Sequence, residues 1–140
     1  MKKIVMMLAM VMMLAFSAVC SASNGKVLDA EEGIAAKFLN GANYNAVVSV
    51  MSDEMKKNWD EKSYANFKEE LNKNFGKIST NQLIVLEKHE GADLLLYQVA
   101  SEKIPAARFV YLFAVKGEKP LLSDFRIMLP QAKEEAADKK

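Results

Sequence analysis

The chain has 140 residues, 51% of them hydrophobic, and its 19 basic and 18 acidic residues almost cancel. No basic excess is present to attract nucleic acid, and a single cysteine excludes a disulfide-stapled scaffold. The one histidine, His89, gives a histidine-based metal site or catalytic triad little to build on. The length allows one domain and not two.

The N-terminus has the layout of a bacterial secretory signal. Lys2 and Lys3 give a positive start, residues 4–16 form an unbroken apolar run, and residues 17–23 are mostly small. The apolar run is shorter than the roughly 20 residues that a membrane-spanning helix needs. We therefore predict a cleaved signal peptide over residues 1–22 and an exported protein, periplasmic or extracellular, with no transmembrane span after processing.

Two positions compete for the cleavage. Small residues favour a cut between Ala22 and Ser23, and a second, weaker site follows Cys20. Acylation of Cys20, as in a lipoprotein, is a minor alternative, because residues 17–19 differ from the usual lipoprotein pattern in two of three positions. After cleavage at Ala22 the chain has no cysteine, so the core alone must hold the fold.

Residues 23–130 are predicted to form a single α+β roll domain, followed by a polar tail over residues 131–140. Apolar residues recur at helical spacing up to about residue 75, and strand-like runs follow. A capping box at Asp29 and Glu32 is expected to start the first helix, which stops at Gly41.

Three further helices are expected before the sheet. Asn43 is the predicted cap of a short second helix, Ser52 begins a third, and Gly76 ends the last one. The buried stripe of that last helix is predicted to contain Tyr64, Phe67, Leu71 and Phe75.

Four strands are expected near residues 77–88, 93–101, 107–116 and 121–129. The connections between them are short and polar, which makes neighbouring strands antiparallel. The predicted fold class is therefore α+β, with N-terminal helices packed on a four-stranded antiparallel sheet.

Two motifs in the helical half carry a resemblance. One is the helix end Leu39-Asn40-Gly41-Ala42-Asn43-Tyr44, and the other is the short segment Met51-Ser52-Asp53-Glu54-Met55. With the helix that closes on Gly76, they resemble an uncharacterised bacterial family of extracytoplasmic domains, similar to the nuclear-transport-factor-like, or cystatin-like, superfamily. The resemblance covers residues 27–129. It implies a cone with a pocket between sheet and helices, used for catalysis in some members and for binding or dimerisation in many.

The charges beside the strands are the main candidates for chemistry. Arg108 could meet Asp93 or Asp124 on an adjacent strand. Alternatively, these charges and Arg126 could all lie on the solvated side or near strand ends. An enzyme of this fold would need a lone carboxylate such as Asp93 or Asp124, tuned by burial. We predict no catalytic residue, no cofactor and no metal site.

Aromatic residues suggest a pocket for a small apolar ligand. Its candidate lining is Tyr44, Trp59, Tyr97 and Arg108, whose polar tips would provide hydrogen bonds. Ordinary packing in the core is the alternative.

The central strands are apolar on both sides. In the third strand, Phe109, Tyr111 and Phe113 form one set, expected below the helices, and Val110, Leu112 and Ala114 form the other. Helices can cover only one face, so we expect a homodimer through the sheet. The leading functional hypothesis is an exported, non-catalytic binding or assembly domain of unknown partner. A small-molecule pocket protein is the second, and an enzyme of the same fold that uses a buried carboxylate is the third.

The export hypothesis predicts the mass of the secreted protein. The mature chain should begin at Ser23, or less often at Ser21, and carry no lipid. Intact-mass spectrometry of secreted material measures this directly, and a diacylated Cys20 at the N-terminus would contradict it.

Overall fold

The computed structural model describes residues 25–131. The predictions for the signal peptide, for Cys20, Ala22 and Ser23, and for nearly all of the polar tail lie outside these residues.

The order of elements is helices first and sheet second. The N-terminal helix covers residues 25–40 of the described chain. It is followed by α2 (Tyr44–Val47), the 3-10 turn η1 (Val48–Val50), α3 (Asp53–Asn58) and α4 (Glu61–Phe75).

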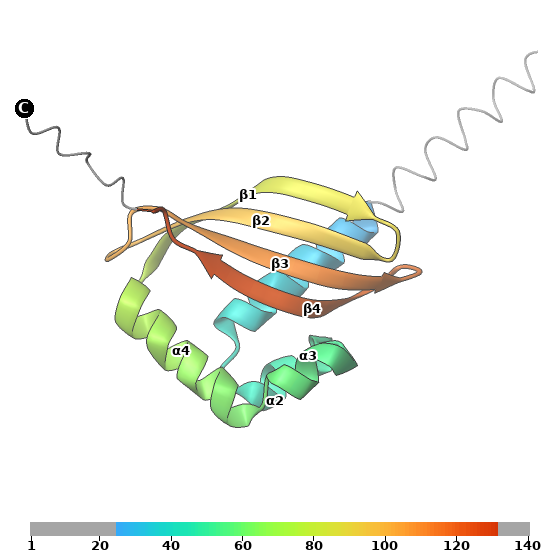
Figure 1. Cartoon of the computed structure of the whole chain (residues 1–140), viewed down its shortest axis with the longest axis horizontal. Coiled ribbons are helices and arrows are strands. Elements are labelled where there is room, and N and C mark those ends of the chain that lie inside the picture. Colours follow the sequence, from blue (N-terminus) through green and yellow to red (C-terminus); the bar gives the residue numbers. More distant parts are fainter. Residues whose placement is uncertain (1–24, 132–140) are drawn as a thin grey trace, which may run out of the picture.

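A four-stranded antiparallel sheet follows in the order β1-β2-β3-β4. Its strands are β1 (Ile78–His89), β2 (Ala92–Ser101), β3 (Ala107–Lys116) and β4 (Lys119–Met128). In Figure 1 the N-terminal helix crosses behind the sheet, and α2, α3 and α4 lie below β4 in this view. The predicted α+β class, with its helices N-terminal to the strands, is confirmed.

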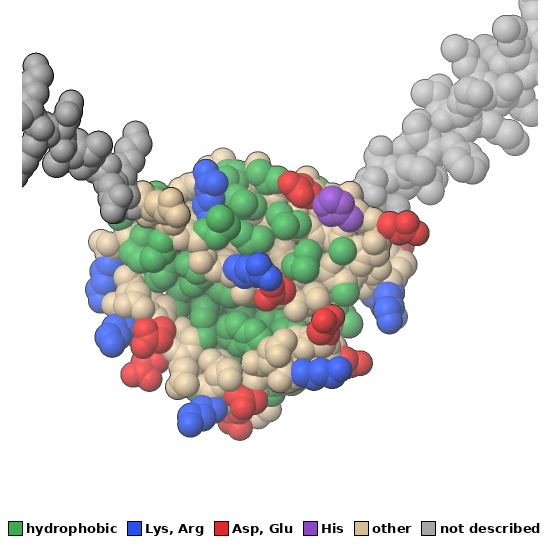
Figure 2. All heavy atoms as spheres, viewed as in Figure 1, with side chains coloured by type: hydrophobic (Ala, Val, Ile, Leu, Met, Phe, Trp, Pro, Cys, Tyr) green, Lys and Arg blue, Asp and Glu red, His purple; other side chains and the backbone are tan. Residues whose placement is uncertain are grey.

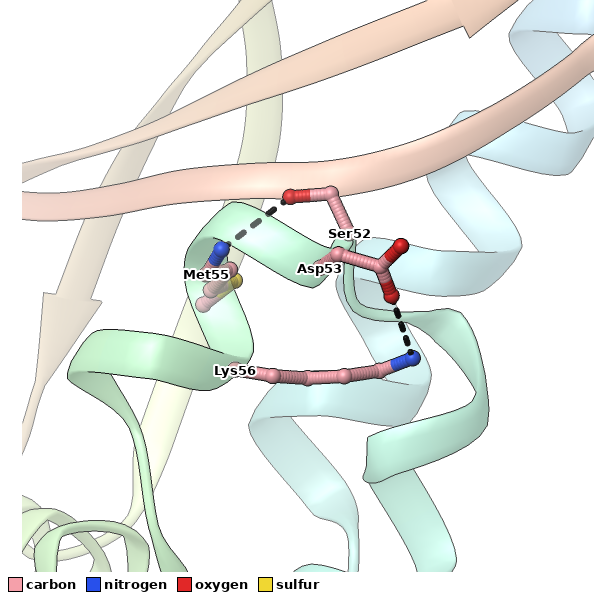
Figure 3. A network of polar contacts seen from close by, with 4 residues as sticks. All are labelled: Ser52, Asp53, Met55 and Lys56. Carbon is pink, nitrogen blue, oxygen red and sulfur yellow. Dashed lines mark hydrogen bonds and ion pairs between the residues drawn. The ribbon is translucent and has the colours of Figure 1, made fainter.

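Local capping signals explain the helix boundaries. The side chains of Asn43 and Ser52 accept hydrogen bonds from the backbone N–H groups of Ala46 and Met55, at 3.1 and 3.2 Å. Figure 3 shows the Ser52 cap beside the exposed Asp53–Lys56 ion pair of α3. These two caps were predicted correctly.

Of the boundaries predicted for the two longer helices, one is correct and one is wrong. Gly76 ends α4 with a φ of 67°, a backbone conformation that favours glycine. The predicted capping box at Asp29 and Glu32 is wrong, because the helix already includes residues 25–28 and both acids lie within it.

The core is built on the alternation of β3. Phe109, Tyr111 and Phe113 are all buried beneath the helices, as their spacing predicts. Phe38 of the N-terminal helix is fully buried at the centre of an aromatic cluster. Four rings have their centroids 5.2–5.6 Å from that of Phe38, and they belong to Trp59, Tyr64, Phe67 and Phe125.

Short contacts fasten the helical layer to the sheet. The backbone N–H of Ser52 donates to the carbonyl of Leu122 in β4 at 2.8 Å. The Tyr64 hydroxyl donates to the carbonyl of Phe38 at 2.7 Å, which fixes α4 against the end of the N-terminal helix. Burial raises the pKa of Tyr64 to about 12, so this donor keeps its proton at neutral pH.

Removing the Phe38 ring from the centre of the aromatic cluster should lower the free energy of unfolding. Phe38→Ala leaves a cavity that the four neighbouring rings cannot fill, so we expect a loss of about 3–5 kcal/mol in the free energy of unfolding. Leu129→Ala, at an exposed position, is the control and should change stability little. Urea denaturation measures both, and a loss below about 1 kcal/mol for Phe38→Ala would contradict the assigned core.

Candidate functional site: the outer face of the sheet and a buried acid pair

The side of the sheet that faces away from the helices is called the outer face here. Along β2 and β3 every second side chain points to it, and these side chains are only partly covered. Figure 2 shows hydrophobic side chains gathered across this face, with charged side chains among them. Its apolar residues on the two central strands are Ala92, Leu94, Leu96, Ala100, Val110, Leu112 and Ala114. The expectation that the smaller set of β3 faces away from the core is confirmed.

An ion pair lies within this apolar surface. The Nε of Arg126 donates to Asp124 Oδ2 at 2.8 Å, and the Arg126 side chain is 76% exposed. Asp124 faces Leu112 on β3, and Arg126 faces Val110. Because the pair lies along one strand, the rest of the guanidinium is open to a partner.

Of the alternatives considered for Arg108, neither the ion pair with Asp93 nor that with Asp124 forms. Asp124 pairs with Arg126, while Asp93 pairs with Lys88 of β1. Arg108 is exposed and lies opposite Gln98 and Met128, so neither acid is its cross-strand neighbour.

Two hollows mark the outer face. One, of ≈ 200 Å³, is lined by Leu94, Val110 and Leu112 with Asp124 and Arg126. The other, of ≈ 400 Å³, lies at the end of β4. Its lining includes Gln98, Ala106, Arg108, Met128, Leu129 and Pro130.

The four candidate pocket residues do not share one site. Tyr97 is buried on the core face, where its ring contacts Tyr111 edge-on with centroids 5.4 Å apart. Arg108 lies on the opposite face of the sheet, because its register partner is Gln98 and not Tyr97. Tyr44 and Trp59 are half-buried and pack against the core. Tyr97 and these two aromatic residues therefore act as packing residues.

The sequence analysis missed Glu31, which forms a buried acid pair with the candidate carboxylate Asp93. Glu31 of the N-terminal helix is fully buried, and Asp93 at the start of β2 is 4% exposed. The Asp93 carboxylate accepts a hydrogen bond from the Lys88 ammonium at 2.5 Å. No N–H or O–H group of residues 25–131 donates to either oxygen of Glu31. The polar group within hydrogen-bond range of Glu31 is the other carboxyl, Asp93.

Two carboxyl groups can share a hydrogen bond only if one of them holds a proton. Burial, followed by the hydrogen bond and the negative charge of Asp93, raises the pKa of Glu31 to about 7, while the Lys88 charge acts in the opposite direction. Burial together with Glu32 and Glu31 also raises the pKa of Tyr97, to about 12. Between the ordinary value of 4.5 and about pH 7 the cluster therefore keeps a proton that an ordinary glutamate loses.

Helical spacing is the signal that could have identified Glu31 from the sequence. Val27, Glu31 and Ala35 are four residues apart and all three are buried, so the acid occupies a position on the apolar stripe. A charged residue on such a stripe needs a buried partner, and the sequence offers Asp93 and Lys88 at the first hairpin.

Within the part of the chain that the structure describes, no three His, Cys, Asp or Glu side chains are close enough together to hold a metal ion. None of the described helices is long and apolar enough to cross a membrane. Comparison with family models, with curated proteins and with solved structures found no match to this chain.

The buried Lys88–Asp93 ion pair and the exposed Lys56–Asp53 ion pair should contribute differently to the free energy of unfolding. Lys88→Gln leaves Asp93 buried beside Glu31 without a cation, so we expect a loss of about 1–3 kcal/mol in the free energy of unfolding at pH 7. Lys56→Gln removes the partner of the exposed Asp53 and should change stability little. Denaturant melts measure the free energy of unfolding of both variants. Equal losses would show that the buried ion pair stabilises the fold no more than the exposed one.

Proposed function

We propose that the protein is an exported, non-catalytic assembly domain that associates with a second copy of itself through the outer face of the sheet. The observation that carries the proposal is the apolar outer face, which no helix of the described chain covers (Figures 1 and 2). Soluble monomers rarely expose a contiguous apolar patch of several hundred Å². The N-terminal signal pattern supports export, and the order of helices and strands agrees with what the nuclear-transport-factor-like resemblance implies.

The size of the face fits a modest interface. Four strands of 10 to 12 residues, about 4.8 Å apart with a rise of about 3.3 Å per residue, cover roughly 600 Å². A standard interface buries about 800 Å² on each partner. We therefore expect a dimer at the weaker end of specific association, whose population depends on concentration.

The charges on the face suit a copy of the same surface. A two-fold axis brings the same patch of both partners together, so each Arg126 can approach the Asp124 of the other copy. Both charges are then matched, and the apolar residues around them are covered. A wholly apolar partner would instead desolvate the Asp124–Arg126 ion pair without replacing its contacts with water, which is unfavourable.

The ligand-binding alternative rests on the hollow of ≈ 400 Å³ at Arg108, which combines one cation with apolar walls at Met128 and Leu129. The enzymatic alternative finds its buried carboxyls in Asp93 and Glu31, and not in Asp124. Because Glu31 has no solvent-exposed surface, a substrate cannot reach it in this conformation. Self-association is the function that the geometry supports best.

Leu112→Arg should separate the dimer. The side chain lies on the outer face opposite Leu94 and Asp124, so the substitution places like charges near the two-fold axis while the core set of β3 stays unchanged. Analytical ultracentrifugation at protein concentrations up to about 100 μM should show a wild-type dimer and a folded monomeric variant.

Ala65→Arg is the matched control, because it adds the same charge at an exposed position of α4. It should leave the dimer intact. A wild-type protein that remains monomeric throughout this range, or a dimer that Leu112→Arg does not weaken, would overturn the proposal.

A further inference from the structure

The buried cluster of Glu31, Asp93 and Lys88 joins two parts of the chain that are distant in sequence. Glu31 belongs to the first half of the N-terminal helix, while Lys88 and Asp93 lie on either side of the turn between β1 and β2. In Figure 1 the start of this helix lies beside the end of the sheet where that hairpin turns.

The charges of the cluster balance only with a proton. One ammonium and one carboxylate cancel, so the second carboxyl is neutral only while it is protonated. Once it is ionised, two adjacent carboxylates face one lysine in a site shielded from water, and their repulsion is strong. Tyr97 on β2 and Glu32 of the N-terminal helix also lie close to the cluster. Neither of these groups supplies a positive charge.

The two ends of the N-terminal helix are held with different strength. Its second half contains Phe38, at the centre of the aromatic cluster, and its last turn is tied to α4 by Tyr64 and by Lys68, which donates to the carbonyl of Leu39. The first half contributes fewer buried residues, and most of β1 is exposed on the hairpin side. Local opening would therefore occur where the acid pair is.

We propose that Glu31, Asp93 and Lys88 form a proton-controlled latch, which holds the first half of the N-terminal helix on the β1–β2 hairpin while Glu31 is protonated and loosens when the proton leaves. The direction follows from linkage. The closed state binds the proton with a pKa of about 7, whereas an open, solvated Glu31 has the ordinary value of 4.5. The helix is held most strongly below pH 4.5. Its attachment weakens as the pH rises from 4.5 to about 7, and it changes no further above pH 7.

Amide hydrogen exchange of the whole protein, corrected for the intrinsic effect of pH, tests this latch. Between pH 5 and pH 7 we expect protection of amides in residues 25–34 to fall about tenfold per pH unit, because one proton is released on opening. Amides of α4 and β3 should keep their protection. Equal loss in all elements, or no pH dependence in residues 25–34, would overturn the latch.

Two variants separate the acid pair from its surroundings. Glu31→Gln mimics the protonated acid, so the pH dependence in residues 25–34 should disappear. Asp29→Asn removes an exposed acid from the same helix and should retain it. If Glu31→Gln does not fold, carboxyl ¹³C NMR of the wild-type protein decides the matter. A Glu31 titration midpoint near 7 supports the latch, and one near the ordinary 4.5 overturns it.

Discussion

The alternation of side chains along β3 is the constraint on which both faces of the molecule depend. Successive residues of a strand point to opposite sides, so the large aromatic residues 109, 111 and 113 can fill the space beneath the helices only if the smaller apolar residues 110, 112 and 114 face outward. Moving the register by one residue would put Phe109 and Tyr111 in water. The core thus dictates an apolar outer face, and the outer face is the feature that needs a partner.

Signals that act between near neighbours allowed much of this fold to be predicted. Asn43, Ser52 and Gly76 were recognised as boundaries because a cap or a positive φ depends on a few adjacent residues. The four strands were placed correctly because short turns such as that at Gly91 force an antiparallel meander. The start of the first helix was misplaced, since Asp29 and Glu32 have the spacing of a capping box but lie in a helix that had already begun.

Side-chain pairing across the sheet was predicted less well, for a physical reason. Phe113 pairs with Leu122, and an unbroken ladder would pair Tyr111 with Asp124 on the core face. The irregularity between Leu112 and Phe113 instead places Asp124 opposite Leu112, on the outer face. The hydrophobic pattern of β4 does not reveal such a bulge, so the face of the sheet on which Asp124 and Arg126 lie could not be derived from the sequence. The candidate pocket failed in a similar way, because the register decides that Tyr97 and Arg108 point to opposite sides.

Glu31 is the residue that packing alone does not explain. An apolar side chain at this position would continue the buried stripe from Val27 to Ala35, and it would avoid the desolvation of a second carboxyl beside Asp93. Asp93 already has its cation in Lys88, so charge neutrality does not require Glu31 either. What Glu31 adds to the cluster is a proton that binds near neutral pH. That proton lies at the contact between the helix and the hairpin, on the opposite side of the sheet from the outer face. Proton release can therefore loosen the helix while the surface proposed for assembly stays in place.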